Sequence, residues 1–287
     1  MIKLKKIEMD QKKIINDCIS NIRDVNLKKR IVSSENEIIE KSKKYDKTAE
    51  KSELYKFEEH DKLESGAQKN DMIKLYNEKF SRLDQLGRKY YDKIILSAPY
   101  KRCPYCGHRE VSTLDHYLAK TKFPVFSITP YNLIPCCSEC NRQKTSTVIK
   151  QKEKQIIHPY YDDFSKETWI FARLIEGDPI VFEFYVQCPK EWDEIKKERA
   201  KNHFEEFKLN ELYSPYAAEE SIECLGRIKR LFKKGGQELA MDELQEDIRT
   251  IKEHAMNSWK VAMYQAIRDS SWFWEIYLPN EIKNREC

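Results

Sequence analysis

The sequence is short of glycine and of long apolar runs. Only 7 of its 287 residues are glycine while 35% are charged, and this composition favours helix. No apolar run approaches the ~20 residues that a membrane span needs. The first residues, Met1–Glu8, lack the apolar core of a secretory signal. The ATP-binding motif Gly-x-x-x-x-Gly-Lys-Ser/Thr is missing too, so nucleotide control would have to come from another chain. We therefore predict a soluble, cytoplasmic protein.

The charge is spread unevenly along the chain. Residues 98–158 contain ten Lys and Arg against four Asp and Glu, a net charge of +6, whereas residues 159–287 have a net charge of −7. A basic segment suits phosphate binding, although a solvated surface can have the same composition. The 16 Tyr, 12 Phe and 5 Trp supply enough apolar mass for a core. The length allows one large domain or two to three smaller ones.

Two Cys-x-x-Cys pairs indicate a metal site. The first is Cys103 with Cys106, and the second is Cys137 with Cys140. Four thiolates at this spacing suit one tetrahedral zinc ion, and a closed site of this kind is structural rather than catalytic. Cys136 with Cys140 is the alternative second pair, but only Cys137 repeats the first spacing. Buried thiols or disulfides are the other interpretation, and cytosolic chains rarely keep disulfides. The remaining cysteines are then spare thiols: Cys18, Cys136, Cys188, Cys224 and Cys287.

A second group of polar residues lies between the cysteine pairs. Asp115 and His116 follow an alternating run at 111–114 that predicts a short strand, and the run 124–128 could be the returning strand. A helix is expected from Cys140 to Lys150, with Asn141 and Lys144 on one face. Neighbouring residues of a regular strand point to opposite faces. Asp115 and His116 can therefore converge on one site only if the strand ends or bends there.

These motifs resemble those of HNH endonucleases, which have the ββα-metal fold. The matching residues are Leu-Asp115-His116, Asn132-Leu and Cys-Asn141-Arg-Gln-Lys144, in the family's order and spacing. The resemblance implies that His116 is the general base and that Asn132 holds it in place through hydrogen bonds. It implies that Asp115 and Asn141 bind a catalytic divalent ion, Mg²⁺ or Mn²⁺. Other branches have His where this chain has Asn141, so the metal preference could differ.

The chemistry of phosphodiester hydrolysis agrees with this set of residues. A general base contributes about 10²–10⁴-fold, far below the 10⁶ or more that is typical of enzymes. A metal ion must therefore polarise the phosphate and stabilise the leaving oxygen. The resemblance also implies a phosphate contact for Lys144, and Arg142 is the second candidate nucleic-acid contact. One alternative is a zinc-stabilised nucleic-acid-binding module without cleavage. Another is a partner-docking protein whose acidic C-terminal half binds an ATPase.

A weaker resemblance extends on both sides of the motif. The stretch from Ile94 through His158-Pro-Tyr-Tyr-Asp, together with His203-Phe, resembles HNH nucleases of bacterial defence systems. The nearest kind is the HNH partner of Septu-type systems, a pairing that some retron systems share. The resemblance implies a role in antiphage defence beside an SMC-like or ABC-type ATPase. His158 is more plausibly structural than a ligand.

The expected fold is α+β: an HNH core with a four-cysteine zinc clip, flanked by mainly helical regions. Residues 1–70 are expected to form a charged helical arm or to be partly disordered. Residues 71–158 would be the nuclease core with a leading amphipathic helix from Met72 to Leu86. Residues 159–287 would begin with a β-hairpin around Gly177-Asp178-Pro179 and continue as helices, with a break at Gly235-Gly236.

Overall fold

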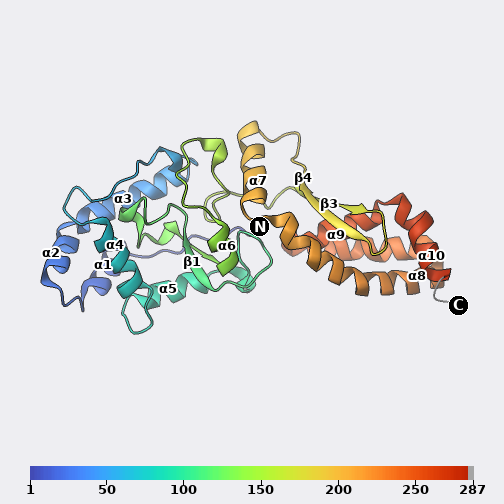
Figure 1. The fold of residues 1–287 in the computed structure, drawn as a ribbon, viewed down its shortest axis with the longest axis horizontal. Helices are drawn as coiled ribbons and strands as arrows, with labels where there is room; N and C mark the ends of the chain where they lie inside the picture. The colour runs from blue at the N-terminus through green and yellow to red at the C-terminus, as the bar shows by residue number, and fades with distance from the viewer. Residues whose placement is uncertain (284–287) are drawn as a thin grey trace. The chain divides into compact units, whose positions relative to one another are not determined.

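The computed structural model describes residues 1–283. It is mixed α+β, mostly helical, with two small two-stranded sheets (Figure 1). Contacts divide the chain into two compact units, Met1–Asp163 and a second unit that begins at Phe164. The predicted limit at residue 158 lies close to this boundary, but no boundary between compact units falls at residue 70. None of the helices within residues 1–283 is long and apolar enough to cross a membrane.

The first three helices of unit 1 are α1 (Gln11–Ile19), α2 (Val25–Ser33) and α3 (Glu35–Ala49) (Figure 1). The carboxylates of Asp10 and Asp24 accept hydrogen bonds from the first amides of α1 and α2, which fixes where these helices begin. Ile14, Ile38 and Tyr45 are fully buried. Residues 1–70 are therefore part of the core of unit 1, not a separate arm.

The predicted helix from Met72 to Leu86 is shorter than expected. Helix α4 (Lys69–Lys74) continues into a π-helical turn at Leu75–Phe80, and the chain then leaves the helix before α5 (Arg88–Ile95). Gly87 is the N-cap residue of α5. A Cβ there would lie 2.4 Å from the carbonyl oxygen of Lys79, so the close approach of the two segments requires glycine.

The small sheet of unit 1 carries the motif residues. Strand β1 (Thr113–His116) pairs antiparallel with β2 (Leu133–Cys136), with Asp115 opposite Ile134 and His116 opposite Leu133. The prediction that 124–128 returns as a strand is wrong, because Pro124–Phe126 forms a 3₁₀ turn and the sheet partner comes later. Helix α6 (Ser138–Gln143) begins before Cys140 and ends well before Lys150.

Unit 2 opens with the predicted hairpin. Strands β3 (Ile170–Ile175) and β4 (Val181–Val186) pair antiparallel across the turn. The helices are α7 (Glu194–Glu206), α8 (Leu209–Ala255), α9 (Trp259–Arg268) and α10 (Leu278–Lys283). The predicted break is present in α8, where Gly235 and Gly236 leave the helical conformation. Arg227 forms an ion pair with Asp247 across this break, so the two halves of α8 fold back on each other.

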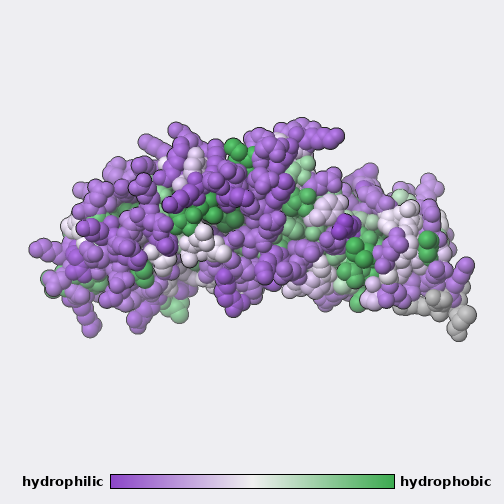
Figure 2. Space-filling model, turned by 45° about the horizontal axis from the view of Figure 1, so that its top comes forward, coloured by the Kyte–Doolittle hydropathy of each residue, from purple (hydrophilic) through white to green (hydrophobic). Residues whose placement is uncertain are grey.

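Aromatic side chains form the centre of unit 1. The Tyr45 ring lies 5.1 Å from Phe126 and 6.3 Å from Phe57, and its hydroxyl is 3.1 Å from Nε2 of the buried His158. His158 is therefore part of the packing behind the small sheet. The face shown in Figure 2 is mainly hydrophilic, with hydrophobic side chains in separate patches. Cys287, one of the predicted spare thiols, lies outside the described residues.

Candidate active site and zinc site

The four predicted cysteines come together. The sulfur atoms of Cys103, Cys106, Cys137 and Cys140 all lie within 4.8 Å of one another, and all four residues are buried. A tetrahedral zinc ion with Zn–S bonds of about 2.3 Å would hold its thiolates about 3.8 Å apart, which this cluster accommodates. Cys136 lies in β2 outside the cluster, so the choice of Cys137 is confirmed. No other group of three His, Cys, Asp or Glu ligands is found within residues 1–283.

Local backbone geometry builds the two knuckles. Gly107 follows the first pair with φ +65°, a left-handed conformation that suits glycine, and its amide donates to the Cys103 carbonyl over 2.7 Å. Cys137 is the N-cap residue of α6, and its sulfur accepts from the Cys140 amide. The cluster therefore ties the loop before β1 to the start of α6.

Asp115 is held from both sides. The hydroxyl of Tyr105, which lies inside the first cysteine knuckle, donates to Oδ2 over 2.7 Å. The Lys144 ammonium, at the end of α6, is 3.2 Å from the Asp115 carboxylate and 2.8 Å from the His116 carbonyl. Burial and then the charge of Asp115 raise the pKa of Tyr105, so its hydroxyl stays a donor. The zinc knuckle thus positions the carboxylate directly.

His116 is oriented by a backbone carbonyl. Its Nε2 lies 2.9 Å from the carbonyl oxygen of Ser127. A carbonyl only accepts, so Nε2 carries the proton and Nδ1 keeps its lone pair. Within residues 1–283, Nδ1 has no hydrogen-bond partner, and it is not among the fully buried unpaired atoms. Burial, with the nearby charge of Lys120, lowers the pKa of His116 to about 3, which keeps the ring neutral.

Asn132 connects the two segments that flank this histidine. Its Oδ1 accepts from the Leu118 amide over 2.7 Å, and its Nδ2 donates to the carbonyls of Leu118 (3.0 Å) and Phe126 (3.1 Å). The side chain is fully buried. These bonds join the chain just after His116 to the turn just before Ser127. They therefore help to hold the Ser127 carbonyl at hydrogen-bonding distance from the His116 ring.

The remaining predicted residues lie on or beside α6. Asn141 is partly exposed on the helix that packs against β1, and Arg142 is exposed. The Lys144 ammonium contacts Asp115 and the His116 backbone, so in this state it does not project toward solvent. A carboxylate has about four lone-pair sites, and Asp115 therefore keeps capacity beyond Tyr105 and Lys144. Carboxylate and amide oxygens suit Mg²⁺ or Mn²⁺, so the donors fit the predicted ion.

Comparison with known proteins finds two relatives. The chain is 27% identical to protein ea31 of Escherichia phage lambda over 280 residues, which cover 91% of this chain and 94% of that protein. It is also 27% identical to the Septu protein PtuB of Bacillus thuringiensis over 96 residues, 32% of this chain and 37% of that protein. No family model matches the chain. No solved structure matches it either.

The structure adds site residues that the motif did not indicate. Tyr105 lies within the Cys-Pro-Tyr-Cys knuckle, and the spacing of the cysteines does not indicate a function for this tyrosine. Tyr76 packs its ring edge-on against His116, with centroids 4.4 Å apart, and comes from the π-helical turn. Such turns are frequent at functional sites. Lys120 lies four residues after His116, with its ammonium 4.7 Å from the Tyr76 ring centre.

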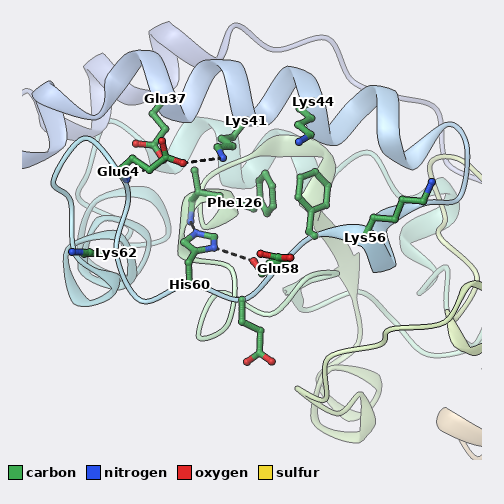
Figure 3. A pocket seen from close by; sticks show the side chains of 12 residues that line it. Glu37, Lys41, Lys44, Lys56, Glu58, His60, Lys62, Glu64 and Phe126 are labelled. Carbon is green, nitrogen blue, oxygen red and sulfur yellow. Dashed lines mark hydrogen bonds and ion pairs between the residues drawn. The ribbon is translucent and has the colours of Figure 1, made fainter.

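A pocket of about 440 Å³ lies behind the turn that precedes Ser127 (Figure 3). Lys41 and Lys44 reach into it from α3, opposite the segment around Glu58 and His60, and Phe126 forms part of its wall. Its lining contains four Lys and four Glu side chains, so charge does not mark it as a phosphate site. Helix α3 lies on the side of this pocket opposite the segment around Glu58, and α3 contacts the turn that precedes Ser127.

Proposed function

We propose that this chain is a metal-dependent HNH endonuclease that hydrolyses phosphodiester bonds in nucleic acid. The single observation that supports this best is the hydrogen bond from His116 Nε2 to the Ser127 carbonyl, 2.9 Å long. It fixes the tautomer in which Nδ1 can accept a proton from water, as a general base must. Asp115 lies beside His116 in β1, and the buried Asn132 lies in the turn directly before β2.

Each side chain then has a defined task. His116 takes the proton of the attacking water at Nδ1, and Asn132 keeps the Ser127 carbonyl in register with the ring. Asp115 and Asn141 would hold a Mg²⁺ or Mn²⁺ ion, which when bound stabilises charge on the phosphate and the leaving oxygen. Tyr105 and Lys144 hold the Asp115 carboxylate in place. The zinc ion would serve the fold and not the reaction.

We further propose that the nuclease acts in antiphage defence with an SMC-like or ABC-type ATPase partner. The similarity to the Septu protein PtuB over part of the chain supports this assignment. The absence of a nucleotide-binding loop from the sequence is consistent with control by a second chain.

The test is cleavage of plasmid DNA and of total RNA by purified protein with Mg²⁺ or Mn²⁺. Wild type should cut, His116→Ala should lose about 10²-fold or more, and zinc content should be the same in both. His254→Ala is the matched control, because His254 is exposed on α8 in unit 2. Equal cutting by wild type and His116→Ala would contradict the assignment. Silence of the wild type, even with a co-purified partner, would favour a binding role without cleavage.

A further inference from the structure

Lys120 is a half-buried cation that forms no direct ion pair within residues 1–283. Its ammonium lies 4.7 Å from the centre of the Tyr76 ring. Burial lowers the pKa of Lys120, while the charge of Asp115 acts in the opposite direction. Removing an ammonium from water without a paired charge is unfavourable, and a cation–π contact offsets only part of this cost. The position therefore suits a cation that is completed by a ligand.

The neighbouring lysines are engaged differently. The Lys144 ammonium contacts Asp115 and the His116 carbonyl, and its side chain is only 8% exposed. The Lys122 side chain is 44% exposed, and its ammonium pairs with Glu59 over 2.8 Å. Of these three, only Lys120 combines a half-buried side chain with the lack of a direct ion pair to any residue from 1 to 283. It also packs on the same Tyr76 ring as His116.

We propose that Lys120 binds a non-bridging oxygen of the scissile phosphate, so that the substrate supplies the missing negative charge. This inference rests on the proposed nuclease function. A phosphodiester carries one negative charge and gains more as water attacks, and a fixed cation in a partly dry site stabilises that gain. The ammonium and the His116 imidazole, on one aromatic ring, would face the phosphate and the attacking water together. Lys144 would then keep its structural task.

Three variants test this role. Lys120→Met keeps the aliphatic stem on Tyr76 and removes the charge, and should lower kcat by about 10²-fold. Lys120→Arg keeps a phosphate-binding cation and should stay within about tenfold of wild type. Lys122→Met, two residues away and outside the site, should behave as wild type. Zinc content checks that unit 1, which contains both lysines, is folded in all three.

A binding measurement separates phosphate contact from a merely structural effect. In a His116→Ala background, the slope of log affinity against log salt concentration should fall by about 0.7–0.9 when Lys120→Met is added, because one phosphate contact is lost. A wild type that cleaves while Lys120→Met cleaves equally well would overturn this inference alone. An unchanged salt slope, or an inactive Lys120→Arg, would also overturn it. A wild type that neither binds nor cleaves nucleic acid would overturn the nuclease function and this inference together.

Discussion

Replacing Asn132 with alanine should both destabilise unit 1 and abolish cleavage, because the same buried hydrogen bonds are lost. The substitution leaves the Leu118 amide and the Leu118 and Phe126 carbonyls without their side-chain partner. An unsatisfied buried polar group costs about 1–3 kcal/mol, and water can reach the two partly buried groups, so we expect a loss of about 3–5 kcal/mol. The turn that carries the Ser127 carbonyl then loses its anchor, and His116 loses its fixed orientation.

The distribution of tryptophan makes the two units separately measurable. All five tryptophans lie in unit 2, so their fluorescence follows the unfolding of that unit alone; they are Trp169, Trp192, Trp259, Trp272 and Trp274. Zinc release to a chromogenic chelator follows unit 1, which contains the cysteine cluster. At about 2 kcal/mol per molar urea, the zinc-release midpoint should fall by roughly 1.5–2.5 M in Asn132→Ala. The fluorescence midpoint should not move.

Asn257 offers a matched control in unit 2. It is 6% exposed, its Oδ1 accepts from the Trp169 amide over 2.9 Å, and its Nδ2 donates to the carbonyls of Phe164 and Glu167 over 3.0 Å each. Asn257→Ala should therefore lower the fluorescence midpoint and leave zinc release unchanged. If Asn132→Ala shifts the zinc-release midpoint by less than about 0.5 M urea, Asn132 does not anchor the turn. Equal shifts of both signals would refute independent unfolding of the units.

Two further predictions concern the metal and the pH dependence. Cys137→Ser should lose zinc and cleavage, whereas Cys136→Ser should keep about one zinc per chain by metal analysis. The reason is that Cys137 belongs to the four-cysteine cluster and Cys136 does not. Burial alone would raise the pKa of Glu220, but Lys260 (2.6 Å) and the Tyr264 hydroxyl (2.9 Å) lower it overall. The carboxylate thus stabilises unit 2 above its unfolded pKa of about 4.5, and this stabilisation is lost as the pH falls through the lowered folded value. The free energy of unfolding of wild type should exceed that of Glu220→Gln by about 1 kcal/mol at pH 7. This difference should become smaller toward pH 3. A difference that stays constant with pH in urea titrations would contradict the linkage.

The sequence predicted correctly those features that depend on residues close together in the chain. The hairpin formed as predicted, since two β-rich runs flank a Gly-Asp-Pro turn, and the four cysteines were fixed by their repeated spacing. The segment 124–128 was predicted wrongly for a physical reason. Its apolar residues are all buried, but Pro124–Phe126 forms a 3₁₀ turn. The carbonyls of Phe126 and Ser127 accept from Asn132 and His116 instead of from a strand.

Long-range contacts explain what the sequence could not reveal. Tyr45 bonds to His158 across 113 residues, and Gln11 donates to the Ile128 carbonyl across 117 residues. Neither contact has a signature within a window of a helix or strand, so residues 1–70 read as a polar arm. The position of Lys120 above Tyr76 depends likewise on the π-helical turn, which amphipathic periodicity does not predict. The assigned roles of the site residues stay predictions.

The packing of α3 against the 124–126 turn limits how this chain can be dissected. A fragment that starts at residue 71 would include every cysteine of the cluster and every reactive side chain. It would lack Tyr45 and Phe57, whose rings lie 5.1 and 4.9 Å from Phe126, immediately before the carbonyl that aligns the imidazole. A minimal cassette cut at the motif's ends, whether by an engineer or by recombination between genes, would carry the chemistry without the scaffold that aligns it. Transfer of this site to another protein would need the N-terminal helices as well.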